Sequence, residues 1–164
     1  MARALIVACG CRGRGLGRAL GERGWLVRGT TRDPARLAGI RSAGIEPVVA
    51  DPDLAATVLD QIEGVTLIYW LLGSASGEPA AVAALHGPRL ERLLEEIVDT
   101  PVRGFVYEAA GTAPPGDRER GARAVNEAAR RWRIPVVAVD AAAGDDQRWL
   151  AAMLAATDRL IASR

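Results

Sequence analysis

The chain alternates short apolar runs, rich in branched residues, with longer segments of helical period, and this alternation constrains its fold more than any other feature. Such an order is typical of a parallel sheet whose strands are joined by crossover helices. It predicts an α/β fold, a three-layer doubly wound parallel sheet of about six strands with helices on both faces. The expected strands cover 4–9, 25–30, 46–50, 65–72, 102–108 and 135–139. The expected helices cover 14–23, 34–43, 53–63, 79–98, 117–133 and 146–162.

Length and composition limit what such a fold can do. A chain of 164 residues with 49% hydrophobic residues fits a single domain, residues 1–164, with a substantial core. The net charge is only +1, and the basic residues are scattered among acidic ones, so we expect no nucleic-acid partner. All 21 basic residues are arginine, which excludes any mechanism that needs a lysine.

Cysteine and hydropathy patterns indicate the compartment. Cys9 and Cys11 are one residue apart where a strand ends, so their side chains would point to opposite faces and a mutual disulfide is geometrically unfavourable. No apolar run approaches the roughly 20 residues that span a bilayer. We therefore expect a reduced, cytoplasmic protein with no membrane partner. His86, the one histidine, has no ligand spacing to the cysteines, so no metal site is expected, and a surface or helix-break position is the simpler interpretation.

A glycine-rich turn follows the first expected strand. The segment "ACGCRGRGLG", residues 8–17, contains four glycines and two arginines and opens the first helix. The window from Ala8 to Gly13 matches GxGxxG, the phosphate-binding turn of the Rossmann fold, with alanine in the first glycine place. In this pattern Gly10 allows the pyrophosphate to approach the backbone, and Gly13 allows the helix to pack closely on the sheet. We therefore expect a dinucleotide to contact Ala8, Gly10, Cys11, Arg12 and Gly13.

The end of the second expected strand indicates which dinucleotide is bound. An acidic residue there would bind the ribose 2′-hydroxyl of NAD, whereas an arginine accommodates the 2′-phosphate of NADP. The sequence reads Thr30-Thr31-Arg32-Asp33, and Asp33 before Pro34 is explained as a helix cap. Thr31 and Arg32, with Arg12 closing from the glycine turn, therefore favour NADP(H) over NAD(H). The alternative for Arg32 is a solvated surface arginine.

The segment from Ala8 to Pro52 resembles the opening of extended and atypical short-chain dehydrogenase/reductases, the NAD-dependent epimerase/dehydratase-like group. The resemblance continues more loosely through "VTLIYWLLGS", "VRGFVYEAAGT" and "IPVVAVD". It implies the Rossmann fold and a bound dinucleotide. It also implies that Asp51 and Pro52 lie by the adenine, and that the loop Leu71, Leu72, Gly73 and Ser74 runs along the cofactor.

The catalytic residues of that family have no full counterpart in this sequence. Active members use a serine or threonine after the fifth strand and a YxxxK pair on the next helix. Here the fifth strand is followed by "EAAGT", and "DRERGARAVNEAARRW" contains neither tyrosine nor lysine. Glu108 as a general base and Thr112 as a hydroxyl donor are weak candidates, and a partly exposed acid and an ordinary loop hydroxyl are the simpler interpretations. We also expect no C-terminal substrate domain in this chain.

Three functions remain open at this point. The first is an NADP(H)-binding Rossmann-fold protein without the usual catalysis. The second is an active NAD(P)-dependent oxidoreductase or epimerase-like enzyme with an unusual proton donor and an unknown small-molecule substrate. The third is a cofactor-free scaffold. The apolar residues Leu90, Leu93, Leu94, Ile97 and Val98 suggest a homodimer, and the stripe of Trp149, Leu150, Met153, Leu154, Thr157 and Ile161 is expected to face the core.

Overall fold

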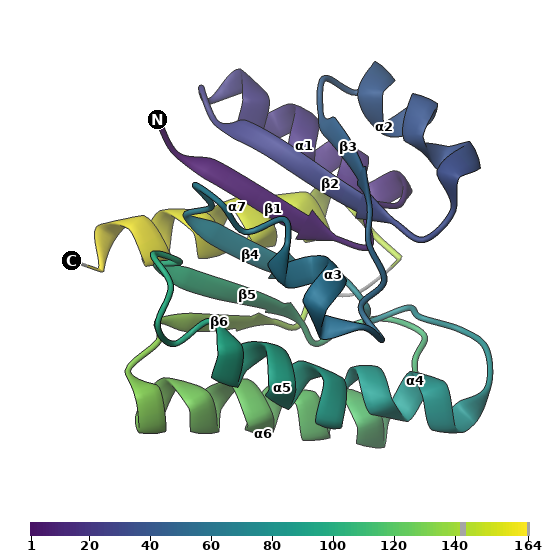
Figure 1. Ribbon diagram of the computed structural model, residues 1–164, viewed down its shortest axis with the longest axis vertical. Coiled ribbons are helices and arrows are strands. Elements are labelled where there is room, and N and C mark those ends of the chain that lie inside the picture. Colours follow the sequence, from purple (N-terminus) through teal and green to yellow (C-terminus); the bar gives the residue numbers. More distant parts are fainter. Residues whose placement is uncertain (142–143, 164) are drawn as a thin grey trace.

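The structure is a computed structural model that describes residues 1–141 and 144–163. Its strands form one parallel sheet in the order β3-β2-β1-β4-β5-β6 (Figure 1). The order reverses between β1 and β4, and ligands of such sheets bind beyond the carboxyl ends of the strands near this switch. The bounds are β1 Arg3–Val7, β2 Leu26–Thr31, β3 Glu46–Val49, β4 Leu67–Trp70, β5 Gly104–Glu108 and β6 Val136–Val139. The predicted doubly wound α/β fold is confirmed.

Helices cover both faces of the sheet (Figure 1). One face packs against α1, α2 and α7, and the other packs against α3, α5 and α6. Because both faces are covered, the central strands are buried throughout, and their alternate side chains supply two separate cores. The helices are α1 Cys11–Glu22, α2 Leu37–Ser42, α3 Ala55–Leu59, α4 Pro79–Leu85, α5 Pro88–Glu96, α6 Pro115–Trp132 and α7 Asp146–Ala162, with a short 3₁₀ turn, η1, over Pro34–Arg36.

Two predicted helices differ from the observed ones. The helix expected over 79–98 is two helices, because Pro88 has no N–H to continue the first and instead begins a new one. The helix expected over 53–63 is shortened to α3, since the chain tightens into i→i+3 turns after Leu59. The first helix was expected from residue 14 but begins at Cys11, so β1 and α1 are joined by only three residues.

The helix caps agree better with the sequence-based prediction than the helix bounds do. The Asp33 carboxylate accepts the N–H of Ala35 at 2.9 Å, and the Asp145 carboxylate accepts the N–H groups of Gln147 and Arg148 at 3.1 Å. Both caps are confirmed. On α7 the inward stripe is confirmed at its centre, but Leu160 rather than Ile161 is buried near its end. In the described part of the chain, no helix combines the length and apolarity that crossing a membrane would need.

The apolar face of α5 is already used inside the chain. Leu90, Leu93, Leu94 and Ile97 are buried in the core under the sheet, and only Val98 is exposed. These residues therefore do not form a free surface. The homodimer stays a prediction.

Candidate functional site

The N-terminus of α1 lies at the switch point of the sheet and is uncapped. Its N-cap residue is Gly10, which has no side chain to cap the helix, and the first turn contains no acidic residue. The backbone N–H groups of Cys11, Arg12 and Gly13 have no acceptor among the described residues. Free N–H groups and the positive end of the helix dipole make such a terminus suited to an anion.

The glycines of this turn have different roles. A Cβ at Gly13 would lie 3.3 Å from Ile6 Cγ2 and 3.5 Å from Cys9 Sγ, so this glycine lets α1 pack closely on the sheet. A Cβ at Gly10 would meet no atom within 4 Å. The space beside Gly10, at the N-terminus of α1, is therefore open.

Ala8 makes the tight turn that a glycine makes in the GxGxxG pattern. It has a positive φ of 64°, in the left-handed region that disfavours a Cβ. The turn is held by Thr30, whose hydroxyl accepts the Ala8 N–H at 3.0 Å and whose carbonyl accepts the Cys9 N–H at 2.8 Å. The alanine thus preserves the shape of the turn at a conformational cost of about 1–2 kcal/mol.

Two adjoining hollows of about 370 Å³ each lie along this edge of the sheet. They share Ala8, Gly10, Arg32 and Leu72, so they are two ends of one groove. The β2 hollow is also lined by Cys9, Thr30, Thr31, Asp33, Arg36, Ala50 and Pro52. The β5 hollow is also lined by Cys11, Arg12, Gly13, Leu71, Ser74, Ala75, Ser76, Glu108 and Trp149.

Exposed arginines dominate the β2 hollow. Arg32 is 59% exposed and lies 3.6 Å from Asp53, which is shared with Arg89 at 3.7 Å. Arg36 lies 3.9 Å from Asp33, the acid that caps η1. Both arginines of this hollow are therefore exposed and only loosely paired, Arg32 with Asp53 and Arg36 with Asp33, so their guanidinium groups remain accessible to a ligand.

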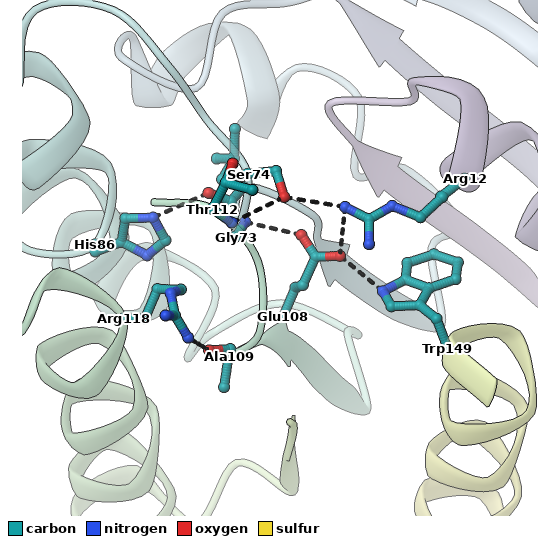
Figure 2. Close-up of polar contacts among 10 residues, drawn as sticks. Arg12, Gly73, Ser74, His86, Glu108, Ala109, Thr112, Arg118 and Trp149 are labelled. Carbon is teal, nitrogen blue, oxygen red and sulfur yellow. Dashed lines mark hydrogen bonds and ion pairs between the residues drawn. The ribbon is translucent and has the colours of Figure 1, made fainter. Parts of the chain in front are cut away.

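The β5 hollow contains a buried carboxylate (Figure 2). Glu108, the last residue of β5, is only 2% exposed, which corrects the expectation of a partly exposed acid. Its Oε1 accepts the Gly73 N–H at 2.8 Å, and its Oε2 accepts the Trp149 Nε1–H at 2.7 Å. Gly73 is required here, because a Cβ would collide with the Ala110 carbonyl and approach Glu108 Oε1 to 2.8 Å.

Arg12 covers this carboxylate. Its Nη2 lies 3.9 Å from Glu108 Oε2 and donates to Ser74 Oγ at 3.0 Å, and the guanidinium lies over the Trp149 ring at 5.3 Å (Figure 2). In this arrangement Arg12 contacts residues at the ends of β4 and β5, Ser74 and Glu108, and not the β2 hollow where it was expected from the sequence. Its Nη1 is buried and has no hydrogen-bond partner among the described residues.

The groups around Glu108 have opposing effects on the pKa of its carboxyl. Burial raises the pKa of the Glu108 carboxyl, while the Arg12 guanidinium and the N–H donors of Trp149 and Gly73 lower it. The burial effect is the largest, so the pKa stays above the ordinary value of a glutamate. Arg12 is the one charged group that opposes it in the described surroundings.

Behind the β4 loop lies a buried histidine. His86 ends α4, in agreement with the predicted helix-break position, and it is fully buried rather than on the surface. Its Nε2–H donates to the Leu72 carbonyl at 2.9 Å, so the Tyr107 hydroxyl donates to Nδ1, at 2.5 Å. Burial lowers the pKa of His86, which favours this neutral ring. His86 thereby fixes the carbonyl of a groove-lining residue.

Most of the residues expected at the site line the groove. The exceptions are Asp51 and Gly73 among the cofactor candidates, and Thr112 among the catalytic ones. The Asp51 carboxylate accepts the N–H of Asp53 at 2.9 Å, and Thr112 is an exposed loop residue whose N–H donates to Ser74 Oγ. Within the described residues, no group of three or more histidine, cysteine or acidic side chains could hold a metal ion.

Arg36 and Trp149 line the groove, although local sequence patterns did not place them there. The sequence places Arg36 only at a helix start and Trp149 only in the core, whereas Ser74 belongs to the loop that the resemblance places along the cofactor. Ser74 and Trp149 meet Arg12 and Glu108 across 62 and 41 positions of sequence, respectively. Of Arg36 and Trp149, only Arg36 had a local signal, since it follows Arg32 by four positions across the short η1 turn.

Comparison with known proteins identifies the fold. No protein-family model matches the chain, and no curated protein matches it in sequence. A short-chain dehydrogenase/reductase superfamily protein from Agrobacterium tumefaciens with bound NAD matches with a TM-score of 0.69 at 21% identity, over 84% of this chain and 48% of that one. UDP-glucuronic acid 4-epimerase from Bacillus cereus, in complex with NAD, matches with a TM-score of 0.66 at 14% identity, over 85% and 56%.

A proposed NAD-dependent epimerase/dehydratase from Bacillus halodurans matches with a TM-score of 0.68 at 17% identity, over 87% of this chain and 71% of that one. The chain spans about half the length of the first two structures, 48% and 56%. It therefore has the Rossmann fold of the short-chain dehydrogenase/reductase and NAD-dependent epimerase proteins, as the resemblance in sequence predicted.

Proposed function

We propose that this chain binds a nicotinamide dinucleotide in the groove at the carboxyl edge of its sheet. The observation that carries the proposal is the uncapped N-terminus of α1, whose first N–H groups have no acceptor among the described residues and whose N-cap Gly10 has open space beside it. That space and those donors suit a pyrophosphate. Two structures of the same fold contain NAD, which supports the same class of ligand.

Different parts of the dinucleotide would occupy the two hollows. The pyrophosphate would lie against Cys11, Arg12 and Gly13, and the adenosine half would occupy the β2 hollow near Thr31 and Pro52. The nicotinamide half would then run along Leu71 and Leu72 into the β5 hollow. When bound, the nicotinamide ring supplies hydride-transfer chemistry, and the side chains of this chain bind and orient it.

We propose NADP(H) rather than NAD(H). Arg32 and Arg36 line the β2 hollow, and Asp33, the one acid there, uses its carboxylate to cap η1. A 2′-phosphate would meet two guanidinium groups, whereas a 2′-hydroxyl would meet only the Asp33 carboxylate, one oxygen of which already accepts the Ala35 N–H.

A pair of glycine variants tests the site. Gly10→Ala places a methyl group in the open space beside the free N–H groups, so it should weaken dinucleotide binding at least about 10-fold while the fold survives. Gly15→Ala, on the same helix and also with open space around its Cβ, is the matched control and should leave binding unchanged. Binding can be followed by the thermal shift that NADPH produces. Equal binding by both variants would refute the proposed pyrophosphate position.

A second candidate function is an active oxidoreductase or epimerase-like reaction on an unknown small molecule. The observation that favours it is Glu108, a buried carboxyl with a raised pKa at the nicotinamide end of the groove. Such a group can hold a proton for a carbonyl or alcohol. Turnover of NADPH with a panel of carbonyl compounds, lost in Glu108→Gln with binding retained, would support it. If neither dinucleotide binds, the cofactor-free scaffold becomes the better account.

A further inference from the structure

We propose that Arg12 couples diphosphate binding to proton uptake at Glu108, by leaving the carboxylate when a ligand occupies the N-terminus of α1. The inference rests on the proposed function, because it assumes that the groove binds a diphosphate. It adds a role that neither the fold nor the glycine turn implies. Glu108 becomes a proton-holding group whose state depends on whether the site is filled.

The present position of Arg12 leaves its charge poorly satisfied. Its ion pair with Glu108 is long, at 3.9 Å, and its Nη1 is buried without an acceptor among the described residues. Arg12 is also the second residue of α1, so a cation lies beside the positive end of the helix dipole, where an anion is preferred. A diphosphate at this helix end would therefore give the guanidinium acceptors that it lacks now.

The groups around Glu108 determine how the carboxylate responds when Arg12 moves. Gly73 and Trp149 donate neutral N–H groups to the two carboxylate oxygens, and the nearby Tyr107 hydroxyl is held neutral, since burial raises its pKa. Arg12 is the one cation that faces the carboxylate from the elements packed against it in the described residues. Without this cation the buried carboxylate is disfavoured, and it takes up a proton from solvent.

Movement of Arg12 also opens a path to the carboxyl. Glu108 and Trp149 are each 2% exposed, whereas the Arg12 side chain beside them is 24% exposed, so the guanidinium covers the carboxyl where it lines the β5 hollow. A filled site would thus present a protonated Glu108 to this hollow, next to the Ser74 hydroxyl. An empty site keeps the carboxylate covered and paired.

Calorimetry with ADP-ribose tests the coupling. ADP-ribose carries the adenosine and the diphosphate, and its diphosphate does not titrate near neutral pH. Titrations in buffers of different ionisation enthalpy, from pH 5 to 8, report the number of protons taken up per ligand bound. We expect wild-type protein to take up a fraction that peaks at up to about one proton. Glu108→Gln should bind ADP-ribose with no such uptake.

Two arginine variants form a matched pair. Arg12→Met removes the cation before ligand binds, so it should bind about 10-fold more weakly and take up no proton. Arg14→Met, on the same helix but outside the groove lining, should behave as wild type. Fluorescence gives a second readout: binding should change the emission of Trp149 as the guanidinium leaves its ring, and Trp149→Phe should abolish that change.

The outcomes separate the two proposals. Binding of ADP-ribose with the same proton uptake in wild type and Glu108→Gln would overturn the coupling and leave the proposed function intact. An unchanged Trp149 signal on binding would do the same. Absence of binding of both ADP-ribose and NADPH to the wild-type protein would overturn the proposed function and the coupling together.

Discussion

The two ends of the groove are built differently, although both lie on the same edge of one sheet. At the β2 end, Arg32 and Arg36 are largely exposed, and their acidic partners lie 3.6 Å and 3.9 Å away. At the β5 end, Glu108 and Trp149 are buried, and the Trp149 Nε1–H donates a hydrogen bond to Glu108 Oε2 at 2.7 Å. At the β2 end the arginine side chains are accessible to an anionic ligand. At the β5 end most polar groups already form hydrogen bonds with one another.

This difference predicts two kinds of mutational effect. Changes at the β5 end disturb buried contacts and should lower the free energy of unfolding. Changes at the β2 end remove exposed charges, which contribute little to stability, and should act on ligand affinity alone. The effects should be largest where β4 and β5 meet and smallest at the turn between the two hollows.

Gly73→Ala should be the most damaging substitution. Its Cβ would collide with the Ala110 carbonyl and crowd Glu108, and backbone at this junction of β4 and β5 cannot yield as a flexible side chain would. We expect the free energy of unfolding to fall by about 3 kcal/mol, measured by urea denaturation. Gly10→Ala is the control, with a loss of less than about 1 kcal/mol. Similar losses for the two variants would remove the distinction between a packed and an open glycine.

Arg32→Ala should act on affinity and not on stability. Removing one charge-assisted contact to a 2′-phosphate should weaken NADPH by about 1.5–3 kcal/mol, or roughly 10- to 150-fold, with little change for NADH. Titration of both cofactors into wild type and variant measures the difference. Equal losses for NADPH and NADH would contradict the preference for NADP(H).

Acid should destabilise the protein through His86, which supports the β4 loop. Burial lowers its folded-state pKa below the unfolded value of about 6.5, so the unfolded chain binds the extra proton more readily. Stability is then complete above pH 6.5 and falls below it by up to about 1.4 kcal/mol per pH unit, until the folded-state pKa is reached. His86→Gln should flatten this part of the profile of unfolding free energy against pH. The same slope between pH 7 and 5 in wild type and in His86→Gln would show that His86 can be protonated in place.

Ala8→Gly should stabilise the turn where the two hollows meet. Glycine relieves the positive φ of Ala8, although it also gives the unfolded chain more freedom, so the net gain should be about 0.5–1 kcal/mol. Thermal unfolding would detect it, and Ala4→Gly, at a buried position of β1, should instead lower stability. A loss of stability in Ala8→Gly would mean that the methyl group makes contacts that outweigh the strain.

Local patterns predicted the fold and the β2 end well. Strand positions, the glycine turn and the Asp33 and Asp145 caps depend on residues close in sequence, which single-sequence reasoning can detect. Thr31 and Arg32 follow their strand directly, so their place on the groove follows from topology alone.

The β5 end could not be predicted in the same way. The burial of Glu108 depends on Trp149 of α7 and on Arg12 of α1, which approach it only after the sheet has formed. The sequence around Glu108 resembles that of any strand that ends in an acid. The break at Pro88 was visible in the sequence, but the apolar periodicity on both sides of it favoured one long helix.

The central claim is that the groove binds a dinucleotide through the N-terminus of α1. Its most direct test is a calorimetric titration of the wild-type protein with NADPH and with NADH, at one fixed salt concentration because the expected contacts are ionic. The account predicts micromolar binding of NADPH and weaker binding of NADH. No heat and no thermal shift with either cofactor would contradict it and leave the glycine turn with an architectural role only.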